Sequence, residues 1–210
     1  MKTINVGVIG TGWCGGIRAN TCASSALVGE LHIAEVNAER LREVQKETNP
    51  TFATSDYHDL ISNDGIDAII VSTTPETTHY PITRESLLAG KHVLLEKPLS
   101  LTLDEADELI KLARDRNLKF TVGYSQRFNP KFAYIKKSLE EGTIGTPVSA
   151  LISRHISRKL GDKIGGRIKL SPAAMEATHD IDFVLWCLEP ARPVRVYSQV
   201  VSKEIGRAHV

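Results

Sequence analysis

Residues 1–35 constrain the fold of this chain more than any other stretch. An apolar run typical of a β-strand, Ile4–Ile9, leads directly into the glycine-rich sequence Gly10–Gly15 (GTGWCG). Small residues typical of a helix follow over 17–27, and Leu31–Glu35 predicts a second strand that ends in a carboxylate. This order of strand, G-x-G-x-x-G turn, helix, strand and acid is typical of a dinucleotide-binding βαβ unit.

Each glycine of this turn has a predicted role. Gly10 permits the tight turn out of the strand, Gly12 lets the backbone approach a pyrophosphate, and Gly15 lets the helix lie close to the sheet. Unpaired N–H groups at the start of the helix would face the phosphates. The alternative is a glycine-rich turn that serves packing only. We predict that the whole turn binds the cofactor, through Gly10, Thr11, Gly12, Trp13, Cys14 and Gly15.

The carboxylate at the end of the second strand bears on which dinucleotide is bound. Glu35 lies 25 residues after Gly10, where a carboxylate can accept hydrogen bonds from the ribose hydroxyls of the adenosine. The same charge would repel a 2′-phosphate, and no arginine follows directly, since Val36 and Asn37 come next. The sequence therefore favours NAD over NADP.

Strands and helices alternate from residue 3 to about 123. The predicted strands after the first two are 52–54, 66–71, 93–95 and 119–122. The predicted helices between them are 38–48, 56–61, 77–89 and 103–117. This alternation predicts an α/β fold, with a Rossmann-type doubly wound parallel sheet over residues 1–123. Ligands of such sheets lie outside the carboxyl ends of the strands, so the loops 10–15, 72–79 and 96–98 should line one crevice.

Lys97 is the most informative polar residue of these loops. It stands between Glu96 and Pro98, directly after an apolar strand. Pro98 restricts the backbone of Lys97 to an extended conformation. An ammonium group there could bind a substrate hydroxyl, or stabilise an alkoxide as hydride leaves its carbon. The alternative is a solvated loop lysine that pairs with Glu96.

Several segments together resemble the glucose–fructose oxidoreductase / inositol dehydrogenase (Gfo/Idh/MocA) family. The resemblance runs from about residue 3 to about 200. It rests on Gly10–Gly15, on Thr74-Pro75 followed by His79, on Gly90–Pro98 (GKHVLLEKP), on Val122–Pro130 (VGYSQRFNP) and on His179–Asp182 (HDID). It implies an NAD(P)-dependent oxidoreductase that acts on CH–OH groups of a sugar, a cyclitol or a related polyol. It also implies a Rossmann domain followed by an α+β domain with an open antiparallel sheet, usually used for oligomerisation.

The resemblance further implies roles for individual residues. Lys97 would contact nicotinamide and substrate, and His179 would be the catalytic histidine. An imidazole titrates near neutral pH, so it can take the hydroxyl proton or return it. The cofactor cleft would be lined by Thr73, Thr74, Pro75, His79, Glu96, Lys97, Gln126 and Arg127.

The sequence departs from this family at one position near His179. Many members carry an aspartate one turn before the histidine, and Met175 stands there in this chain. Glu176 lies about 100° further around the helix, so it could orient His179 or bind a substrate hydroxyl, and it is the third catalytic candidate. The departure leaves open another substrate class, or a non-catalytic NAD-binding sensor or regulatory protein. Glu176 and His179 match only half of a di-metal motif, so no metal site is predicted.

Residues 124–203 are interpreted as the first part of the second domain. We expect helices over 130–141 and from 171, and strands over 147–156 and 193–203 of an antiparallel sheet. The basic segment between them is either a solvated loop or a contact for an acidic substrate group; it comprises Arg154, His155, Arg158, Lys159, Lys163 and Arg167. Residues 204–210 resemble a translated sequencing adapter, so we interpret them as a non-native tail on a truncated chain.

Composition excludes several other classes of partner. The net charge is +1, so no bulk attraction to nucleic acid or to an anionic membrane is expected. The three cysteines form no disulfide framework, and the start of the chain does not resemble a signal peptide or a membrane span. We therefore expect a cytoplasmic protein with a small-molecule polyol or sugar substrate. The full-length protein is expected to be a homo-oligomer.

Overall fold

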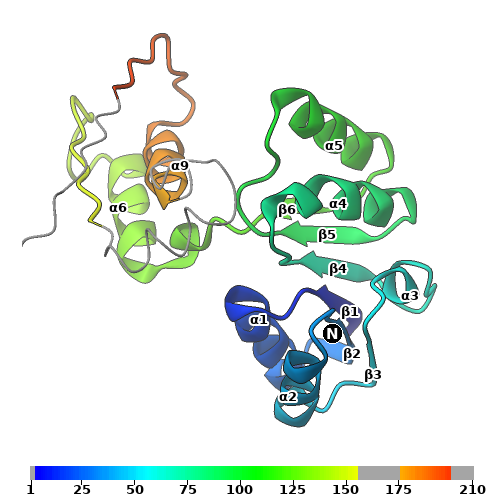
Figure 1. Ribbon diagram of the computed structural model, residues 1–210. Coiled ribbons are helices and arrows are strands. Elements are labelled where there is room, and N and C mark those ends of the chain that lie inside the picture. The colour runs from blue at the N-terminus through cyan, green and yellow to red at the C-terminus, as the bar shows by residue number, and fades with distance from the viewer. Residues whose placement is uncertain (1–2, 156–175, 200–210) are drawn as a thin grey trace, which may run out of the picture.

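The structure is a computed structural model that describes residues 3–155 and 176–199. An α/β body comes first along the chain, and a helical part follows it (Figure 1). Met175, the basic residues after 155, the start of the helix expected from 171 and the tail 204–210 lie outside the described residues. Within residues 3–155 and 176–199, no helix has the length and apolar character that crossing a bilayer requires.

Six parallel strands form the sheet of the α/β body, in the order β3-β2-β1-β4-β5-β6. The strands are β1 (Ile4–Ile9), β2 (Val28–Ala34), β3 (Phe52–Thr54), β4 (Ala68–Val71), β5 (His92–Leu95) and β6 (Phe120–Val122). Val8 of the central strand pairs with Ile33 on one side and with Ile70 on the other. The strand order reverses between β1 and β4, which is where doubly wound sheets bind their ligands. The predicted Rossmann-type sheet is therefore confirmed.

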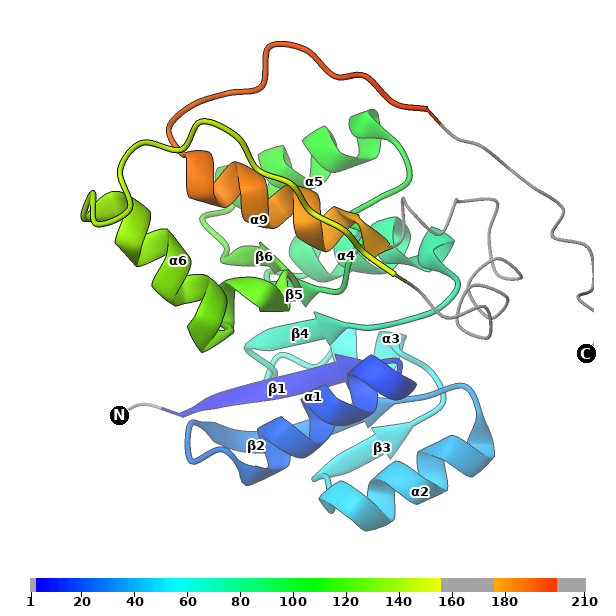
Figure 2. The ribbon, with the colours of Figure 1, turned by 90° about the vertical axis from the view of Figure 1, so that its left-hand side faces the viewer.

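Helices cover both faces of the sheet (Figures 1 and 2). They are α1 (Trp13–Ser24), α2 (Ala38–Thr48), α3 (His58–Ile61), η1 (Glu76–Thr78), α4 (His79–Leu88) and α5 (Leu103–Asp115). Adjacent strand residues point to opposite faces, so Val8 joins the apolar cluster that contains Ala19 and Val44, whereas Ile9 joins the one that contains Leu87 and Leu109. The two clusters form the core of the body.

The helical part follows β6, and its described elements are η2 (Ser125–Phe128), α6 (Pro130–Glu140) and α9 (Thr178–Leu188). α6 packs against α9, where the rings of Phe132 and Phe183 lie 4.7 Å apart. The ammonium group of Lys136 is buried and donates a hydrogen bond of 2.7 Å to the carbonyl of Trp186. These contacts hold the two helices together.

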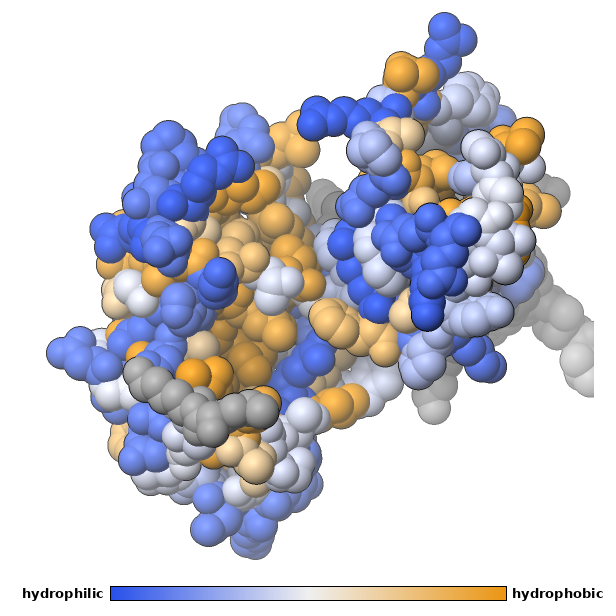
Figure 3. All heavy atoms as spheres, turned by 180° about the vertical axis from the view of Figure 1, so that it is seen from behind, coloured by the Kyte–Doolittle hydropathy of each residue, from blue (hydrophilic) through white to orange (hydrophobic). Residues whose placement is uncertain are grey.

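The two strands predicted for this part are wrong within the described residues, because 147–155 and 193–199 form no strand. A strand is stable only when a neighbour pairs with its backbone groups, and no described segment pairs with either stretch. Their apolar residues stay at the surface, with Val148 97% and Val194 99% exposed. Figure 3 shows apolar side chains at the surface of both parts of the molecule.

Candidate functional site

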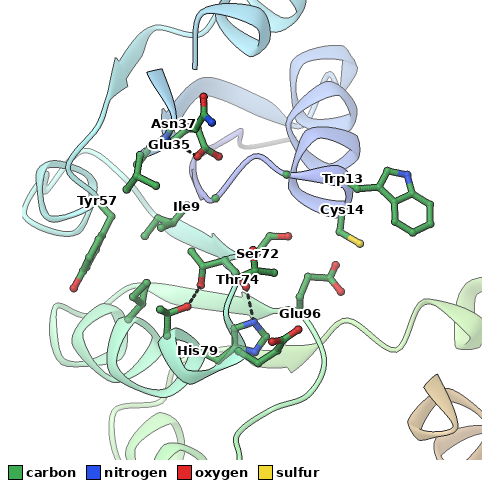
Figure 4. A pocket seen from close by; sticks show the side chains of 18 of the residues that line it. Ile9, Trp13, Cys14, Glu35, Asn37, Tyr57, Ser72, Thr74, His79 and Glu96 are labelled. Atoms are coloured by element: carbon green, nitrogen blue, oxygen red, sulfur yellow. Dashed lines mark hydrogen bonds between the residues drawn. The ribbon is translucent and has the colours of Figure 1, made fainter. Parts of the chain in front are cut away.

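A cavity of about 920 Å³ lies along the carboxyl ends of the strands. The loops after β1, β4 and β5 line it together, as the strand alternation predicts (Figure 4). Its walls run from Glu35, Asn37 and Arg40 at one end to Lys97 and Glu176 at the other. Among the predicted cofactor residues, it is lined by Gly10, Gly12, Trp13, Cys14, Glu35, Thr73, Thr74, His79, Glu96 and Lys97.

The three glycines of the G-x-G-x-x-G motif have different structural roles in the turn after β1. Gly10 has a φ of +81°, and a Cβ there would lie 2.7 Å from the carbonyl oxygen of Ser72. A Cβ on Gly15 would lie 1.9 Å from the carbonyl oxygen of Gly10. A Cβ on Gly12 would meet no atom within 4 Å, and Gly12 lines the cavity. The first and third glycines therefore build the turn, whereas Gly12 keeps the backbone accessible from the cavity.

Glu35 ties the glycine-rich turn to the end of β2. Its Oε2 accepts hydrogen bonds from the backbone N–H of Thr11 at 2.7 Å and from the Thr11 hydroxyl at 2.9 Å. Its Oε1 accepts one from the backbone N–H of Asn37 at 3.0 Å. A carboxylate has about four acceptor sites, so this side chain still has capacity for a ligand hydroxyl. Thr11 itself is fully buried behind the cavity wall.

Arg40 of α2 is a cavity residue that the sequence pattern did not indicate. Its Nε donates a 2.8 Å hydrogen bond to the carbonyl of Thr11, and its Nη1 donates one of 3.0 Å to Glu43. The preference for NAD over NADP rested on the charge of Glu35 and on the lack of an arginine directly after it. The structure brings an arginine to the cavity from further along the chain, because α2 begins at Ala38 and Arg40 on its first turn bonds back to the turn after β1.

His79 lies between the loops that follow β4 and β5. Its ring is 1% exposed. The Nδ1 atom lies 2.7 Å from the carbonyl oxygen of Pro98, and Nε2 lies 3.1 Å from that of Thr73. Both ring nitrogens are thus occupied, so His79 lines the cavity with its ring and does not offer a nitrogen to a ligand. Pro75, the neighbouring predicted residue, is not among the described lining residues.

Glu96 and Lys97 bring opposite charges to the far end of the cavity. Glu96 accepts hydrogen bonds from Nε and Nη2 of Arg18 at 3.1 and 2.8 Å. Its carboxylate also lies against Gly123, where a Cβ would come within 2.8 Å of Oε2. The ammonium of Lys97 lies 3.5 Å from Oε1 of Glu176. Lys97 therefore links the α/β body to the segment just before α9.

His179 stands on the first turn of α9, one helical turn after Glu176. It is half-buried, and its Nδ1 has no hydrogen-bond partner among the described residues. Burial lowers the pKa of His179 below its usual value, and the positive charge of Lys97 lowers that pKa further. The ring of Tyr124 meets it edge-on, with the centroids 6.2 Å apart. At neutral pH the imidazole is therefore predominantly neutral and able to accept a proton.

Gln126 and Arg127 do not line the large cavity. Arg127 pairs with both carboxylate oxygens of Asp182, at 2.9 and 2.6 Å, and so joins η2 to α9. Gln126 lines a second cavity of about 400 Å³, together with Arg154 and Asp180. Arg154 is hydrogen-bonded to Asp180, and its Nη1 also lies 3.8 Å from Oε2 of Glu176. Within the described residues, no group of three or more His, Cys, Asp or Glu side chains could hold a metal ion.

Comparisons with known proteins agree with this geometry. The profile of an oxidoreductase family with an NAD-binding Rossmann fold (GFO_IDH_MocA) matches residues 4–124. Myo-inositol 2-dehydrogenase of Thermotoga maritima is 31% identical over 98% of this chain and 61% of its own. The scyllo-inositol 2-dehydrogenase (NADP(+)) of Bacillus subtilis is 29% identical over 69% of this chain and 39% of its own.

A solved structure extends the similarity. The scyllo-inositol dehydrogenase from Lactobacillus casei, with bound cofactor NAD(H) and scyllo-inositol, superposes with a TM-score of 0.74. The two chains are 25% identical, and the match covers 89% of this chain and 56% of that one. The chain spans about half the length of the curated relatives that it matches.

Proposed function

The chain belongs to the Gfo/Idh/MocA oxidoreductase family, and from this premise we propose that it binds NAD and serves hydride transfer to or from a CH–OH group of a cyclitol or sugar. The observation that carries the proposal is the cavity of about 920 Å³ that joins the bare backbone of Gly12 to the ammonium of Lys97. One cavity thus connects a glycine-rich turn, of the kind that binds pyrophosphate, to an ammonium group that can stabilise negative charge developing on an oxygen atom.

The residues present fit a dinucleotide. The adenosine half would lie at Glu35, which has acceptor capacity left for a ribose hydroxyl. The pyrophosphate would lie at Gly12, whose missing side chain leaves the space open. The nicotinamide half would lie between the loops after β4 and β5, because the second half of a Rossmann sheet binds the second nucleotide.

Two side chains would handle the charge and the proton of the reaction. When bound, the nicotinamide supplies the hydride acceptor or donor. Lys97 would stabilise the negative charge that develops on the substrate oxygen. His179 would take the hydroxyl proton, since its lowered pKa keeps the imidazole neutral near pH 7. Glu176, 3.5 Å from the ammonium of Lys97, would hold that lysine at the end of the cavity.

The charges near Lys97 favour an uncharged substrate. Glu176 lies between Lys97 and Arg154, and Arg154 is also paired with Asp180. Each of these two cations has a carboxylate partner, so among the described residues at this end of the cavity the charges are balanced and do not favour an acidic substrate group. Hydroxyl groups of a polyol can both donate to the carboxylates and accept from the cations. The inositol dehydrogenases among the relatives point to the same class of substrate.

Titration with NADH and NADPH, followed by nicotinamide fluorescence, tests the cofactor part of the proposal. We expect NADH to bind more tightly, because the carboxylate of Glu35 repels a 2′-phosphate. The Glu35→Gln variant should narrow the difference by weakening NADH and strengthening NADPH. Tighter binding of NADPH by the wild-type protein would contradict the preference and would point to Arg40 as a phosphate ligand.

Oxidation of a panel of inositols and sugars with NAD tests the reaction itself. The Lys97→Ala and His179→Ala variants should each lose at least about a hundredfold in turnover while still binding NADH. Full turnover by either variant would refute its assigned role. If the wild-type protein bound NADH tightly but oxidised no polyol, the non-catalytic sensor would become the better interpretation.

A further inference from the structure

Arg18 of α1 forms an ion pair with Glu96 across the carboxyl end of the sheet. Its Nε and Nη2 both donate hydrogen bonds to Oε1 of Glu96, at 3.1 and 2.8 Å. The two residues lie 78 positions apart in the sequence, because α1 follows β1 and Glu96 stands in the loop after β5. The pair therefore ties the helix after the glycine-rich turn to the residue directly before Lys97.

The carboxylate of Glu96 is enclosed and depends on this arginine. The backbone N–H of Glu96 donates a hydrogen bond of 2.9 Å to the carbonyl of Val71. Its side chain lies against Gly123 and is 11% exposed. Within the part of the chain that the structure describes, Arg18 is the ion-pair partner of Glu96. A carboxylate buried to this extent requires such a partner, because its charge has lost most of its hydration.

Lys97 is a second cation close to this carboxylate. Burial raises the pKa of the Cys14 thiol, the charge of Glu96 raises it further, and the charge of Lys97 lowers it, so both charges act on one part of the cavity. Figure 4 shows Cys14 and Glu96 at this end. Among the described residues, however, no ion pair joins Lys97 to Glu96, and the ammonium lies 3.5 Å from Glu176. This contact is longer than the 2.8 Å between Arg18 and Glu96. Lys97 is therefore well placed to replace Arg18 if that arginine is removed.

We propose that Arg18 is a positioning residue that engages Glu96 and so keeps this carboxylate from capturing Lys97. Lys97 thereby stays beside Glu176 at the end of the cavity. Arg18 is not among the described lining residues, so it acts through the two residues of the loop after β5. The consequence for the reaction rests on the proposed function, which assigns to Lys97 the charge on the substrate oxygen. The placement of Lys97 in the ligand-free protein does not depend on it.

A crystal structure of the ligand-free Arg18→Met variant tests this placement. Methionine retains an apolar stem and removes the guanidinium. The loss of one partner leaves an uncompensated charge on the buried Glu96, which is strongly unfavourable. We expect the ammonium of Lys97 to move to about 3 Å from the carboxylate of Glu96, a normal hydrogen-bond distance. A Lys97 side chain that remains beside Glu176 would overturn the proposal.

Oxidation of a polyol with NAD tests the consequence for turnover. In the wild-type background, Arg18→Met should lower kcat about tenfold and leave KM for NAD nearly unchanged, because the misplaced ammonium would act on charge that develops in the reaction. In the Glu96→Gln background, Arg18→Met should have no further effect on kcat, since no carboxylate remains to capture Lys97. A tenfold loss in both backgrounds would show that Arg18 acts by another route and would overturn the proposal.

An ion pair elsewhere on the α/β body supplies the matched control. Arg84 pairs with Glu108 at 2.6 Å, and neither residue is among the described lining residues. Arg84→Met should leave kcat unchanged, and a comparable tenfold loss there would overturn the specific role of Arg18. Where Arg18→Met alone is unstable, its combination with Glu96→Gln leaves no unpaired carboxylate and still allows the second comparison. A wild-type protein that oxidises no polyol would refute the proposed function, and the crystal structure would still decide the placement of Lys97.

Discussion

Gly12 and Gly15 should respond in opposite ways to the same substitution, although both belong to one motif. Alanine at position 15 places a methyl carbon 1.9 Å from the carbonyl oxygen of Gly10. Alanine at position 12 places it in open space, where no atom lies within 4 Å. The first change therefore perturbs the fold, and the second perturbs the space that we assign to a pyrophosphate.

The expected magnitudes follow from these distances. The Gly15 contact must open by more than about 1 Å, and both partners are backbone, so Gly15→Ala should cost at least about 3 kcal/mol in the free energy of unfolding. For a chain of this size the loss corresponds to a fall of about 6–12 °C in Tm. Gly12 has a φ of −58° and a ψ of −157°, at the edge of the extended region that alanine adopts. Gly12→Ala should therefore cost about 1 kcal/mol in stability, well below the cost of Gly15→Ala.

NADH affinity should show the opposite order, with the larger loss in Gly12→Ala. A methyl group at position 12 would occupy the space that we assign to a pyrophosphate, and a loss of about a hundredfold in NADH affinity is expected, equivalent to about 2.7 kcal/mol. The assay is thermal unfolding followed by fluorescence titration with NADH. Gly65→Ala is the control for the general effect of the substitution, because a Cβ there meets only the Asn63 side chain, at 3.1 Å. Unchanged NADH affinity in Gly12→Ala would refute the reasoning, as would wild-type stability in Gly15→Ala.

Two further substitutions probe the far end of the cavity. Lys97→Met should raise the pKa of His179, because the positive charge of Lys97 lowers that pKa in addition to the larger effect of burial. As the pH is lowered, the imidazole of the variant should therefore become protonated at a higher pH than that of the wild-type protein. NMR titration of the ring measures this midpoint, and an unchanged midpoint would show that the two groups do not interact. Gly123→Ala should push the Glu96 carboxylate away from Arg18, since a Cβ lies 2.8 Å from its Oε2. Gly123→Ala should weaken NADH binding severalfold and lower the free energy of unfolding by less than about 2 kcal/mol. Unchanged NADH affinity would contradict this prediction.

The α/β body was predictable because its signals are local. Each strand is an apolar run flanked by a turn, and each helix has a periodic apolar face, so neither requires knowledge of a distant partner. Helix ends were less well predicted: α1 begins at Trp13, directly after the glycine turn, whereas the sequence suggested residue 17. The sequence pattern over 147–156 and 193–203 has the same local appearance as a strand. Over the described residues 147–155 and 193–199 no strand forms, because a strand depends on a neighbour and no described segment pairs with either stretch.

The candidate site was predictable to the same extent and for the same reason. The crevice and the glycine turn follow from the order of the elements along the chain. The pairing of Arg127 with Asp182, 55 residues apart, depends on how η2 meets α9, and no sequence pattern specifies it. The family resemblance placed Arg127 in the cofactor cleft, whereas its guanidinium pairs with Asp182 and joins η2 to α9. Its role in cofactor binding remains a prediction.

The two ends of the cavity differ in how far they depend on tertiary structure. At the adenosine end, the bonds between Thr11 and Glu35 span 24 residues within one βαβ unit. At the other end, the Lys97–Glu176 pair spans 79 residues and crosses from the α/β body to the segment before α9. Displacement of α9 would leave the first set of contacts intact and would separate Lys97 from Glu176. Under the proposed function, dinucleotide binding would therefore depend on the α/β body, whereas hydride transfer would require both parts.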